Sequence, residues 1–197
     1  MTLEEITELV YDPRSPVADA EVKLWYNYVP HLPPGSVIVD QGTAFGKSAC
    51  SMALMAPEST VYTIENFSAL NVSGPEEFQE ILDKKIADYG IKNLVSIRGS
   101  TLDIPWDKEI DFLNNDSDHS FEVTYQELKR WLPFVKKGGY ICLHDWEHNR
   151  WPGISIAFNL LVYYEGNPYG RTSDQKFEAE FLEKDLGAAE IIIFRKL

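Results

Sequence analysis

Short apolar runs alternate with amphipathic stretches along this chain of 197 residues. The runs predict strands, and the β-branched run at 36–40 is typical of a strand buried on both faces of a sheet. They lie at 36–40, 60–65, 93–98, 110–116 and 140–145. The tail that follows Gln175 predicts two more strands, with a turn near Leu186-Gly187.

Helices are predicted between these runs. The clearest one follows Ser120, a good N-cap residue, and has apolar residues at steps of four and three, as one buried helix face requires. These residues are Phe121, Tyr125, Leu128, Leu132 and Val135, and Lys136, Lys137 and Gly138 form a suitable C-terminus. The other predicted helices span 15–29, opened by Ser15-Pro16, and 45–56, 75–89 and 152–165.

Strands that alternate with helices predict an α/β fold, in which a mostly parallel sheet has helices on both faces. Ligands bind such sheets beyond the carboxyl ends of the strands. Side chains that could take part in catalysis or ligand binding lie at that end of four of the predicted strands. They are Asp40, Glu65, Asp116, His144 and Asp145. The sequence therefore predicts a functional site at this edge of the sheet.

The composition is strongly acidic and narrows the range of partners. Lys plus Arg is 18 and Asp plus Glu is 31, so the formal net charge is −13. This charge repels phosphate backbones and anionic lipids, so neither nucleic acid nor a membrane is an expected partner, and it also serves solubility. No signal peptide and no long apolar run is evident, and Cys50 and Cys142, in apolar segments, are expected to be buried thiols. These features favour a reducing, cytoplasmic location.

The stretch "DQGTAFGKSA" at 40–49 looks like a phosphate-binding loop but fails its spacing. A P-loop has four residues between its glycines, whereas Gly42 and Gly46 enclose only three. The dinucleotide fingerprint also fails, because Lys47 occupies its third glycine position. The remaining pattern, an acid and then small residues at alternate positions, favours a polar or cationic nucleoside. Glu65, at the end of the next strand, is placed to accept hydrogen bonds from ribose hydroxyls.

Three longer segments resemble class I S-adenosylmethionine-dependent methyltransferases. "VIVDQGTAFGKSACSMAL" is similar to their first strand, glycine loop and helix, with Ala44 in place of the usual middle glycine, and "TVYTIENF" is similar to their second strand. "IDFLNNDSDHSFEVTYQELKRWLPFVKKGGYICLHDW" resembles a block of the methyltransferase family 24 branch, which is related to catechol and macrocin O-methyltransferases. The resemblance covers about residues 36–165.

The resemblance implies a Rossmann-like three-layer sandwich with a mostly parallel seven-stranded sheet and an antiparallel C-terminal hairpin. It implies one methyltransferase-like domain over 1–197, with an N-terminal helical segment at 1–35, a cofactor-binding core at 36–165 and the hairpin at 166–197. It also implies S-adenosylmethionine as cofactor. The implied cofactor-binding residues are Asp40, Gly42, Thr43, Ala44, Gly46, Ser48, Glu65, Asn66, Ser100, Asp116 and His119.

The implied reaction is O-methylation of a small molecule, with His119, Asp116 and Asp145 as catalytic residues. His119 could act as a general base, since its ordinary pKa is near neutrality, or it could hold the loop before the next helix. Asp116, His144 and Asp145 could share a divalent metal ion, which in the metal-dependent relatives is Mg²⁺. Trp146 is a candidate wall for the acceptor pocket.

Departures from the family pattern keep other functions open. Metal-binding relatives carry two adjacent acids where this chain has His144-Asp145, and Asn114-Asn115 and Ser117 replace apolar residues and a glycine. The alternatives are a catalytically altered or non-catalytic protein that binds the nucleoside, another enzyme of the same fold such as a hydrolase, and a P-loop nucleotidase, against which the loop count argues. A homo-oligomer is compatible with the resemblance.

Overall fold

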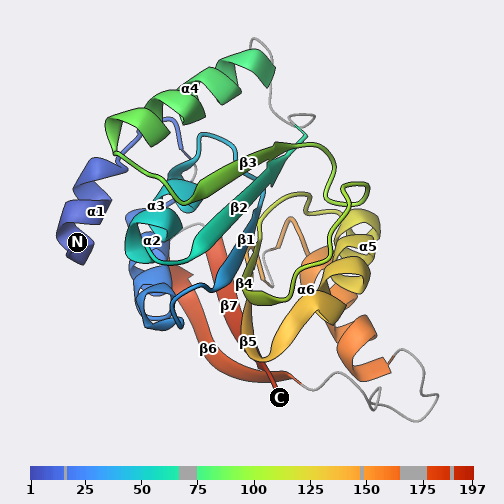
Figure 1. Cartoon of the computed structure of the whole chain (residues 1–197). Coiled ribbons are helices and arrows are strands. Elements are labelled where there is room, and N and C mark those ends of the chain that lie inside the picture. The colour runs from blue at the N-terminus through green and yellow to red at the C-terminus, as the bar shows by residue number, and fades with distance from the viewer. Residues whose placement is uncertain (16, 67–74, 147–148, 165–176, 187–188) are drawn as a thin grey trace. The chain divides into compact units, whose positions relative to one another are not determined.

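The structure is a computed structural model of the whole chain, and it describes all residues except 16, 67–74, 147–148, 165–176 and 187–188 (Figure 1). The contacts between Cα atoms divide the chain into two compact units. Unit 1 is Met1–Asp103 and unit 2 is Ile104–Leu197. The single domain expected over 1–197 stays a prediction.

Unit 1 contains a parallel sheet in which β2 lies between β1 and β3. The strands are β1 (Val37–Gln41), β2 (Thr60–Glu65) and β3 (Leu94–Arg98). The helices are α1 (Leu3–Leu9), α2 (Asp19–Tyr26), α3 (Lys47–Met55) and α4 (Pro75–Asp88), with a 3₁₀ turn η1 (Val29–His31). All three strands begin and end within one residue of the predicted runs, because each run is bounded by turn residues.

Two N-terminal helices differ from the prediction. Helix α1 was not predicted, although Thr2 and Glu5 form a capping box that the spacing Thr-x-x-Glu already contains. Helix α2 begins at Asp19, so the start predicted at Ser15-Pro16 is wrong, and residue 16 lies outside the described part. The reason is local: the amide of Ala18 donates to the carboxylate of Glu21 at 3.1 Å, which closes the first turn there.

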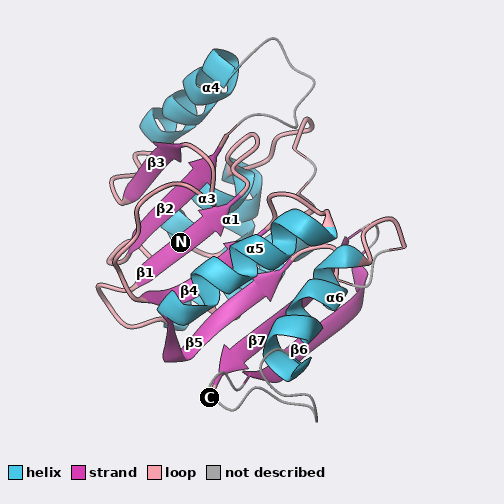
Figure 2. Ribbon diagram, turned by 90° about the vertical axis from the view of Figure 1, so that its right-hand side faces the viewer, coloured by secondary structure: helices cyan, strands magenta, loops and turns pink. Residues whose placement is uncertain are grey.

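Unit 2 contains one parallel and two antiparallel strand pairs. β4 (Ile110–Asn115) pairs in parallel with β5 (Val135–Leu143), and β7 (Ala189–Lys196) lies antiparallel to both β5 and β6 (Phe177–Leu186). This pairing confirms the C-terminal hairpin, whose turn residues 187–188 lie outside the described residues. The helical segments are α5 (Phe121–Trp131), η2 (Leu132–Phe134), α6 (Gly153–Asn159) and η3 (Leu160–Tyr164). Figure 2 shows α5 and α6 side by side over one face of this sheet.

The helix predicted to end at Lys136–Gly138 ends earlier. Pro133 cannot continue an α-helix, and β5 starts at Val135, five residues before the predicted strand. Lys136 therefore lies in a strand, where its ammonium contacts the carboxylate of Asp111 on β4 at 2.9 Å. Gly138, with φ of +83°, allows the bulge between the paired residues Ile110↔Val135 and Phe112↔Tyr140.

Each unit has its own buried apolar centre. In unit 1 the largest fully buried side chains include Trp25, Met52, Ile64 and Phe78, and in unit 2 they include Phe112, Trp131 and Phe158. Cys50 and Cys142 are buried free thiols, as predicted, and burial raises the pKa of Cys50 to about 12. No helix in the described ranges has both the length and the hydropathy needed to cross a bilayer.

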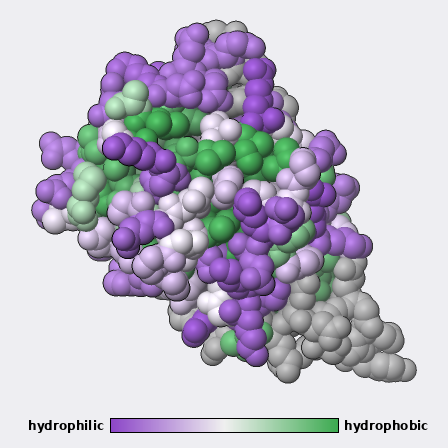
Figure 3. All heavy atoms as spheres, in the orientation of Figure 1, coloured by the Kyte–Doolittle hydropathy of each residue, from purple (hydrophilic) through white to green (hydrophobic). Residues whose placement is uncertain are grey.

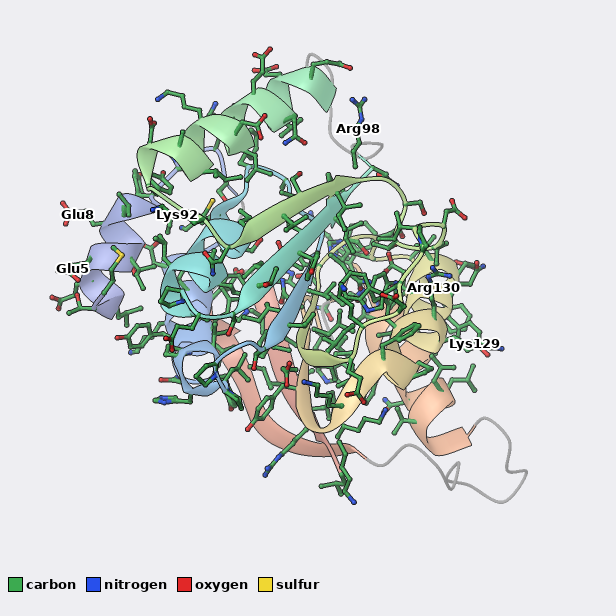
Figure 4. All side chains as sticks on the ribbon, in the orientation of Figure 1. Glu5, Glu8, Lys92, Arg98, Lys129 and Arg130 are labelled. Carbon is green, nitrogen blue, oxygen red and sulfur yellow. The ribbon has the colours of Figure 1, made fainter. Side chains whose placement is uncertain are left out.

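The face of the molecule that Figure 3 shows is mostly polar, and an apolar band crosses it on unit 1. Figure 3 shows this band where Figure 1 places the edge strand β3, and Val95 on that strand is 42% exposed. Acidic side chains lie on the outer side of α1, where Figure 4 shows Glu5 and Glu8 pointing away from the helix into solvent. This distribution agrees with the acidic composition.

Candidate functional site

The glycine loop of unit 1 follows β1 and leads directly into α3. Its backbone turns at three residues with positive φ: Gly42 (+94°), Ala44 (+40°) and Gly46 (+78°). Ala44 is one of two described non-glycine residues in this strained region, which clusters at functional sites in proteins. A Cβ atom on Gly46 would lie 2.6 Å from the side chain of Leu82 on α4, so only glycine fits there.

Beneath the loop, three predicted cofactor-binding residues form a buried polar network. The carboxylate of Asp40 accepts hydrogen bonds from the hydroxyls of Ser48 at 2.9 Å and Thr63 at 3.0 Å. The hydroxyls of Thr43 and Thr63 are 2.5 Å apart. Ser48 thus bonds Asp40 directly and Thr43 reaches Asp40 through Thr63, which stabilises the loop from within unit 1.

The lysine of the Gly-Lys-Ser sequence has a structural position. Lys47 is only 4% exposed, and its ammonium donates to the carbonyl of Val17 and to the carboxylate of Asp19, both at 2.8 Å. A P-loop lysine must instead reach the phosphates of a bound nucleotide. The structure therefore agrees with the loop count: this sequence is not a triphosphate loop.

Glu65 lies at the end of β2, next to the glycine loop. Its carboxylate accepts a hydrogen bond from the amide of Ala44 at 3.2 Å. Asn66 follows it and is exposed, and the Ser100 hydroxyl, after β3, accepts a hydrogen bond from the amide of Leu102 at 3.1 Å. Unit 1 thus brings Glu65 together with the loop residue Ala44, as the sequence predicted for neighbouring strand ends.

Unit 2 carries a cluster of two carboxylates and two imidazoles at the ends of β4 and β5. Asp116 Oδ1 lies 3.2 Å from His119 Nε2 and 3.1 Å from His144 Nδ1. Asp145 contributes its carboxylate at 3.6 Å from His119 Nε2 and 3.4 Å from His144 Nδ1. All four side chains that the sequence placed at these two strand ends are therefore together.

The register of the parallel pair explains this meeting. Asn115 on β4 is paired with Leu143 on β5, and the amide of His144 donates to the carbonyl of Asn115 at 3.1 Å. Asp116 and His144 are the next residues after this pair on the two adjacent strands. Asp145 then adopts φ of +53°, which is uncommon for a residue other than glycine. Such a strained residue in a cluster of titratable groups indicates a functional site.

His119 has a raised pKa in this cluster. Burial of the imidazole favours its neutral form and lowers the pKa, but the hydrogen bond and charge of Asp116, together with the charge of Asp145, raise the pKa of His119 above its usual value. His144 opposes this effect weakly. The carboxylates therefore stabilise the imidazolium that forms when His119 takes up a proton.

The donor atoms of the cluster fit magnesium poorly. The three side chains whose ligand atoms lie within 4.8 Å of one another are Asp116, His119 and His144, one carboxylate and two imidazoles. Mg²⁺ prefers oxygen ligands, whereas imidazole suits Zn²⁺, Fe²⁺ or Ni²⁺. This set differs from the predicted ligands Asp116, His144 and Asp145, and it gives Mg²⁺ no set of oxygen donors comparable to two adjacent acids.

A buried carboxylate that the sequence analysis missed supports the end of β4. Glu127 on α5 is 1% exposed and accepts hydrogen bonds from the Ser117 hydroxyl at 2.6 and 2.7 Å and from the Asn115 side-chain amide at 3.1 Å. Asn115 and Ser117 flank Asp116, so Glu127 fixes both sides of this residue. A buried position for Glu127 follows from its spacing of three and four residues to the buried Thr124 and Trp131, but the buried face was assigned to apolar residues alone.

The tryptophan next to the cluster is not the predicted one. Trp146 is buried in the core of unit 2 against Phe158 and Phe194, so its assignment as a pocket wall is wrong. Trp151 instead has its ring centroid 5.2 Å from that of His119 and is 40% exposed. An exposed indole beside a candidate base offers an apolar surface to an acceptor molecule.

A glycine loop and an acid at the end of the next strand form the arrangement by which α/β proteins bind nucleoside cofactors. The family model described as a methyltransferase domain matches residues 39–146, which is more than half of the chain. The chain belongs to this methyltransferase family. The match spans the glycine loop, Glu65 and the whole acid–imidazole cluster.

Individual relatives are distant. Uncharacterized protein R132 of Acanthamoeba polyphaga mimivirus is 27% identical over 138 residues, which are 65% of this chain and 60% of that protein. The chain therefore matches less than two thirds of that relative's length.

Solved structures share the fold. An O-methyltransferase of Bacillus cereus in complex with SAH has a TM-score of 0.68 at 17% identity, over 99% of this chain and 90% of that chain. An rRNA methylase of Streptococcus thermophilus has a TM-score of 0.66 at 14% identity, over 95% of this chain and 99% of that chain. These similarities confirm the Rossmann-like α/β fold with its antiparallel C-terminal strand pair.

Proposed function

We propose that this protein transfers a methyl group from S-adenosylmethionine to a hydroxyl group of a small molecule, with His119 as the general base. The observation that carries the proposal is the 3.2 Å contact between His119 and Asp116, together with the raised pKa of His119. Paired carboxylates and an imidazole of this kind are suited to proton removal from a hydroxyl.

Unit 1 supplies the groups that would hold the methyl donor. Gly42, Ala44 and Gly46 place small residues at alternate positions of the loop backbone. The carboxylate of Glu65 lies at the strand end where α/β proteins accept hydrogen bonds from ribose hydroxyls. These residues fit an adenosyl group and not a triphosphate, because Lys47 is bonded elsewhere. When bound, S-adenosylmethionine supplies a methyl group on a positively charged sulfur.

Unit 2 supplies the acid–base chemistry. In the His119 tautomer with a proton on Nε2, this N–H donates a hydrogen bond to the Asp116 carboxylate. The lone pair of Nδ1 is then available to take the proton of the acceptor hydroxyl. The deprotonated hydroxyl oxygen would then be the nucleophile toward the methyl group, which bound S-adenosylmethionine would supply from its sulfonium sulfur. Asp116 and Asp145 stabilise the resulting imidazolium, which afterwards releases its proton to solvent.

The electrostatics support a small acceptor over RNA. The net charge is −13, and an acidic protein surface repels a phosphate backbone. The rRNA methylase fold similarity shows only that the same fold serves different acceptors. The half-exposed indole of Trp151 beside His119 supports an acceptor with apolar surface next to its hydroxyl.

The proposal is tested by binding and turnover together. We expect S-adenosylmethionine and S-adenosylhomocysteine, but not ATP or NAD, to raise the melting temperature. Ligand at 100 times its Kd adds about 2.7 kcal/mol to the free energy of unfolding. Methyl transfer is then followed with radiolabelled cofactor against a panel of phenols, sugars and carboxylates.

A matched pair of variants separates the two candidate functions. We expect His119→Asn to lower turnover at saturating cofactor by a factor of about 10² to 10⁴. Gln126→Asn, at an exposed position on α5, is the control. Cofactor binding without methyl transfer to any acceptor would favour the non-catalytic alternative, and absence of cofactor binding would overturn both.

A further inference from the structure

Two buried lysines connect the N-terminal segment of unit 1 to its glycine loop. The ammonium of Lys85, on α4, donates to the carbonyl of Phe45 at 2.7 Å and to the carboxylate of Asp12 at 2.9 Å. Lys47, at the first position of α3, bonds Val17 and Asp19 of the same N-terminal segment. The segment is thus attached to both sides of Gly46.

Both carboxylate oxygens of Asp12 accept hydrogen bonds at this junction. Arg14 donates from Nε and Nη2 to the two carboxylate oxygens of Asp12, each at 2.9 Å, and Lys85 binds one of them as well. The hydrogen bonds from Arg14, opposed by burial and reinforced by Lys85, hold the pKa of Asp12 well below its usual range. Asp12 is therefore charged at neutral pH.

The same groups enclose the side chain of Phe45. The Arg14 guanidinium lies 5.1 Å from the centre of the Phe45 ring, and the Phe78 ring of α4 lies 4.9 Å from it. Phe45 lies between Ala44 and Gly46, which both have positive φ. For Ala44 this backbone conformation is strained, so the surrounding contacts must maintain it. The carbonyl of Phe45 is bonded by Lys85, and its ring packs against Arg14 and Phe78. These contacts restrict the loop to the conformation seen here.

We propose that Lys85 and Asp12 are positioning residues that keep the glycine loop in its cofactor-binding conformation, so that docking of the N-terminal segment sets the affinity for S-adenosylmethionine. The inference rests on the proposed function for the identity of the ligand. A protein whose binding-competent loop is only partly populated binds more weakly by that fraction. Lys85 contacts the loop through the carbonyl of Phe45 and takes no part in the proton transfer proposed for His119. Its loss should therefore weaken the affinity for S-adenosylmethionine and leave the chemical step unchanged.

The test compares two adjacent lysines of α4. Lys85→Met removes the bond to Phe45, while Asp12 keeps Arg14 as a partner. Lys84→Met is the matched control, because Lys84 is 74% exposed and pairs only with Asp88 of its own helix among the salt bridges of the described residues. We expect the Kd for S-adenosylmethionine, measured by calorimetry, to rise about tenfold in Lys85→Met and to stay unchanged in Lys84→Met.

Further readouts exclude a merely structural effect. At saturating cofactor we expect kcat of Lys85→Met to equal that of the wild type, and Asp12→Asn to weaken binding in the same direction. The double variant Lys85→Met/Asp12→Asn should show less than the sum of the two single effects, since both residues act on one contact. A lower kcat with unchanged Kd in the single variants would overturn the proposal.

Hydrogen exchange separates this inference from the proposed function. In protein without cofactor, we expect the loop amides of residues 42–46 to exchange faster in Lys85→Met than in Lys84→Met, with the amides of α3 and of α5 unaffected. Equal exchange in the two variants would overturn the positioning role. Faster exchange in a protein that binds no S-adenosylmethionine would overturn the proposed function alone.

Discussion

The hydroxyl of Ser117 lies 2.6 Å from the buried carboxylate of Glu127. Ser117 stands where the family has a glycine, and Asn115, a second departure, donates to the same carboxylate. The two departures are therefore partners in one hydrogen-bond network around Glu127. The network holds Asp116 from both sides and places it against His119.

Removal of the Glu127 carboxylate should destabilise the protein. Glu127→Ala leaves the buried polar groups of Asn115 and Ser117 without this acceptor, and we expect the free energy of unfolding to fall by about 1–3 kcal/mol. Urea denaturation measures the change. Gln126→Ala, the exposed neighbour on α5, should change it by less than about 0.5 kcal/mol. Equal effects of the two substitutions would contradict a structural role for the network.

The pH dependence of turnover should follow the pKa of His119. Because Asp116 and Asp145 raise this pKa, the basic form appears only above the ordinary value of about 6.5, and kcat/KM should rise with pH through that raised value. Asp116→Asn removes a hydrogen-bond partner and a negative charge, so the midpoint should move to lower pH, with a lower maximal rate. A midpoint that stays in place or moves upward would show that another group titrates.

Glu65 should matter for the cofactor and not for the fold. Glu65→Gln removes the charged acceptor at the end of β2, and we expect the Kd for S-adenosylmethionine to rise about tenfold, equivalent to 1.4 kcal/mol. The control is Glu58→Gln, at an exposed position before the same strand. Calorimetry with S-adenosylhomocysteine should give the same ratio, since the two ligands share the ribose. Unchanged affinity would remove Glu65 from the site.

Magnesium should be unnecessary for turnover. One carboxylate and two imidazoles form the most compact donor set among the described residues, and Mg²⁺ prefers oxygen. We expect neither Mg²⁺ nor EDTA to change kcat. Loss of activity in EDTA that Zn²⁺ or Fe²⁺ restores would assign the cluster to a metal ion with nitrogen ligands. Restoration by Mg²⁺ alone would show that the donor set has been misjudged.

Strand positions could be predicted from local sequence with good accuracy. Runs such as 60–65 are apolar, β-branched and bounded by turns, so the element is fixed by properties of neighbouring residues. The prediction of a helix that reaches Gly138 was wrong because two local signals competed. The apolar spacing continued to Val135, but Pro133 ended the helix, and Val135 pairs with β4 as part of a strand.

The sequence by itself determined the α/β pattern, the glycine loop that is too short for a triphosphate, and the acids and histidines at strand ends. These features depend on spacing along the chain, which secondary structure converts directly into position. Only the tertiary structure decided the partners: Lys47 and Lys85 with the N-terminal segment, Glu127 with Asn115 and Ser117, and Trp151 rather than Trp146 beside His119. Such contacts join residues from separate elements, and a long side chain can satisfy its charge or its burial with any of several neighbours until packing selects one.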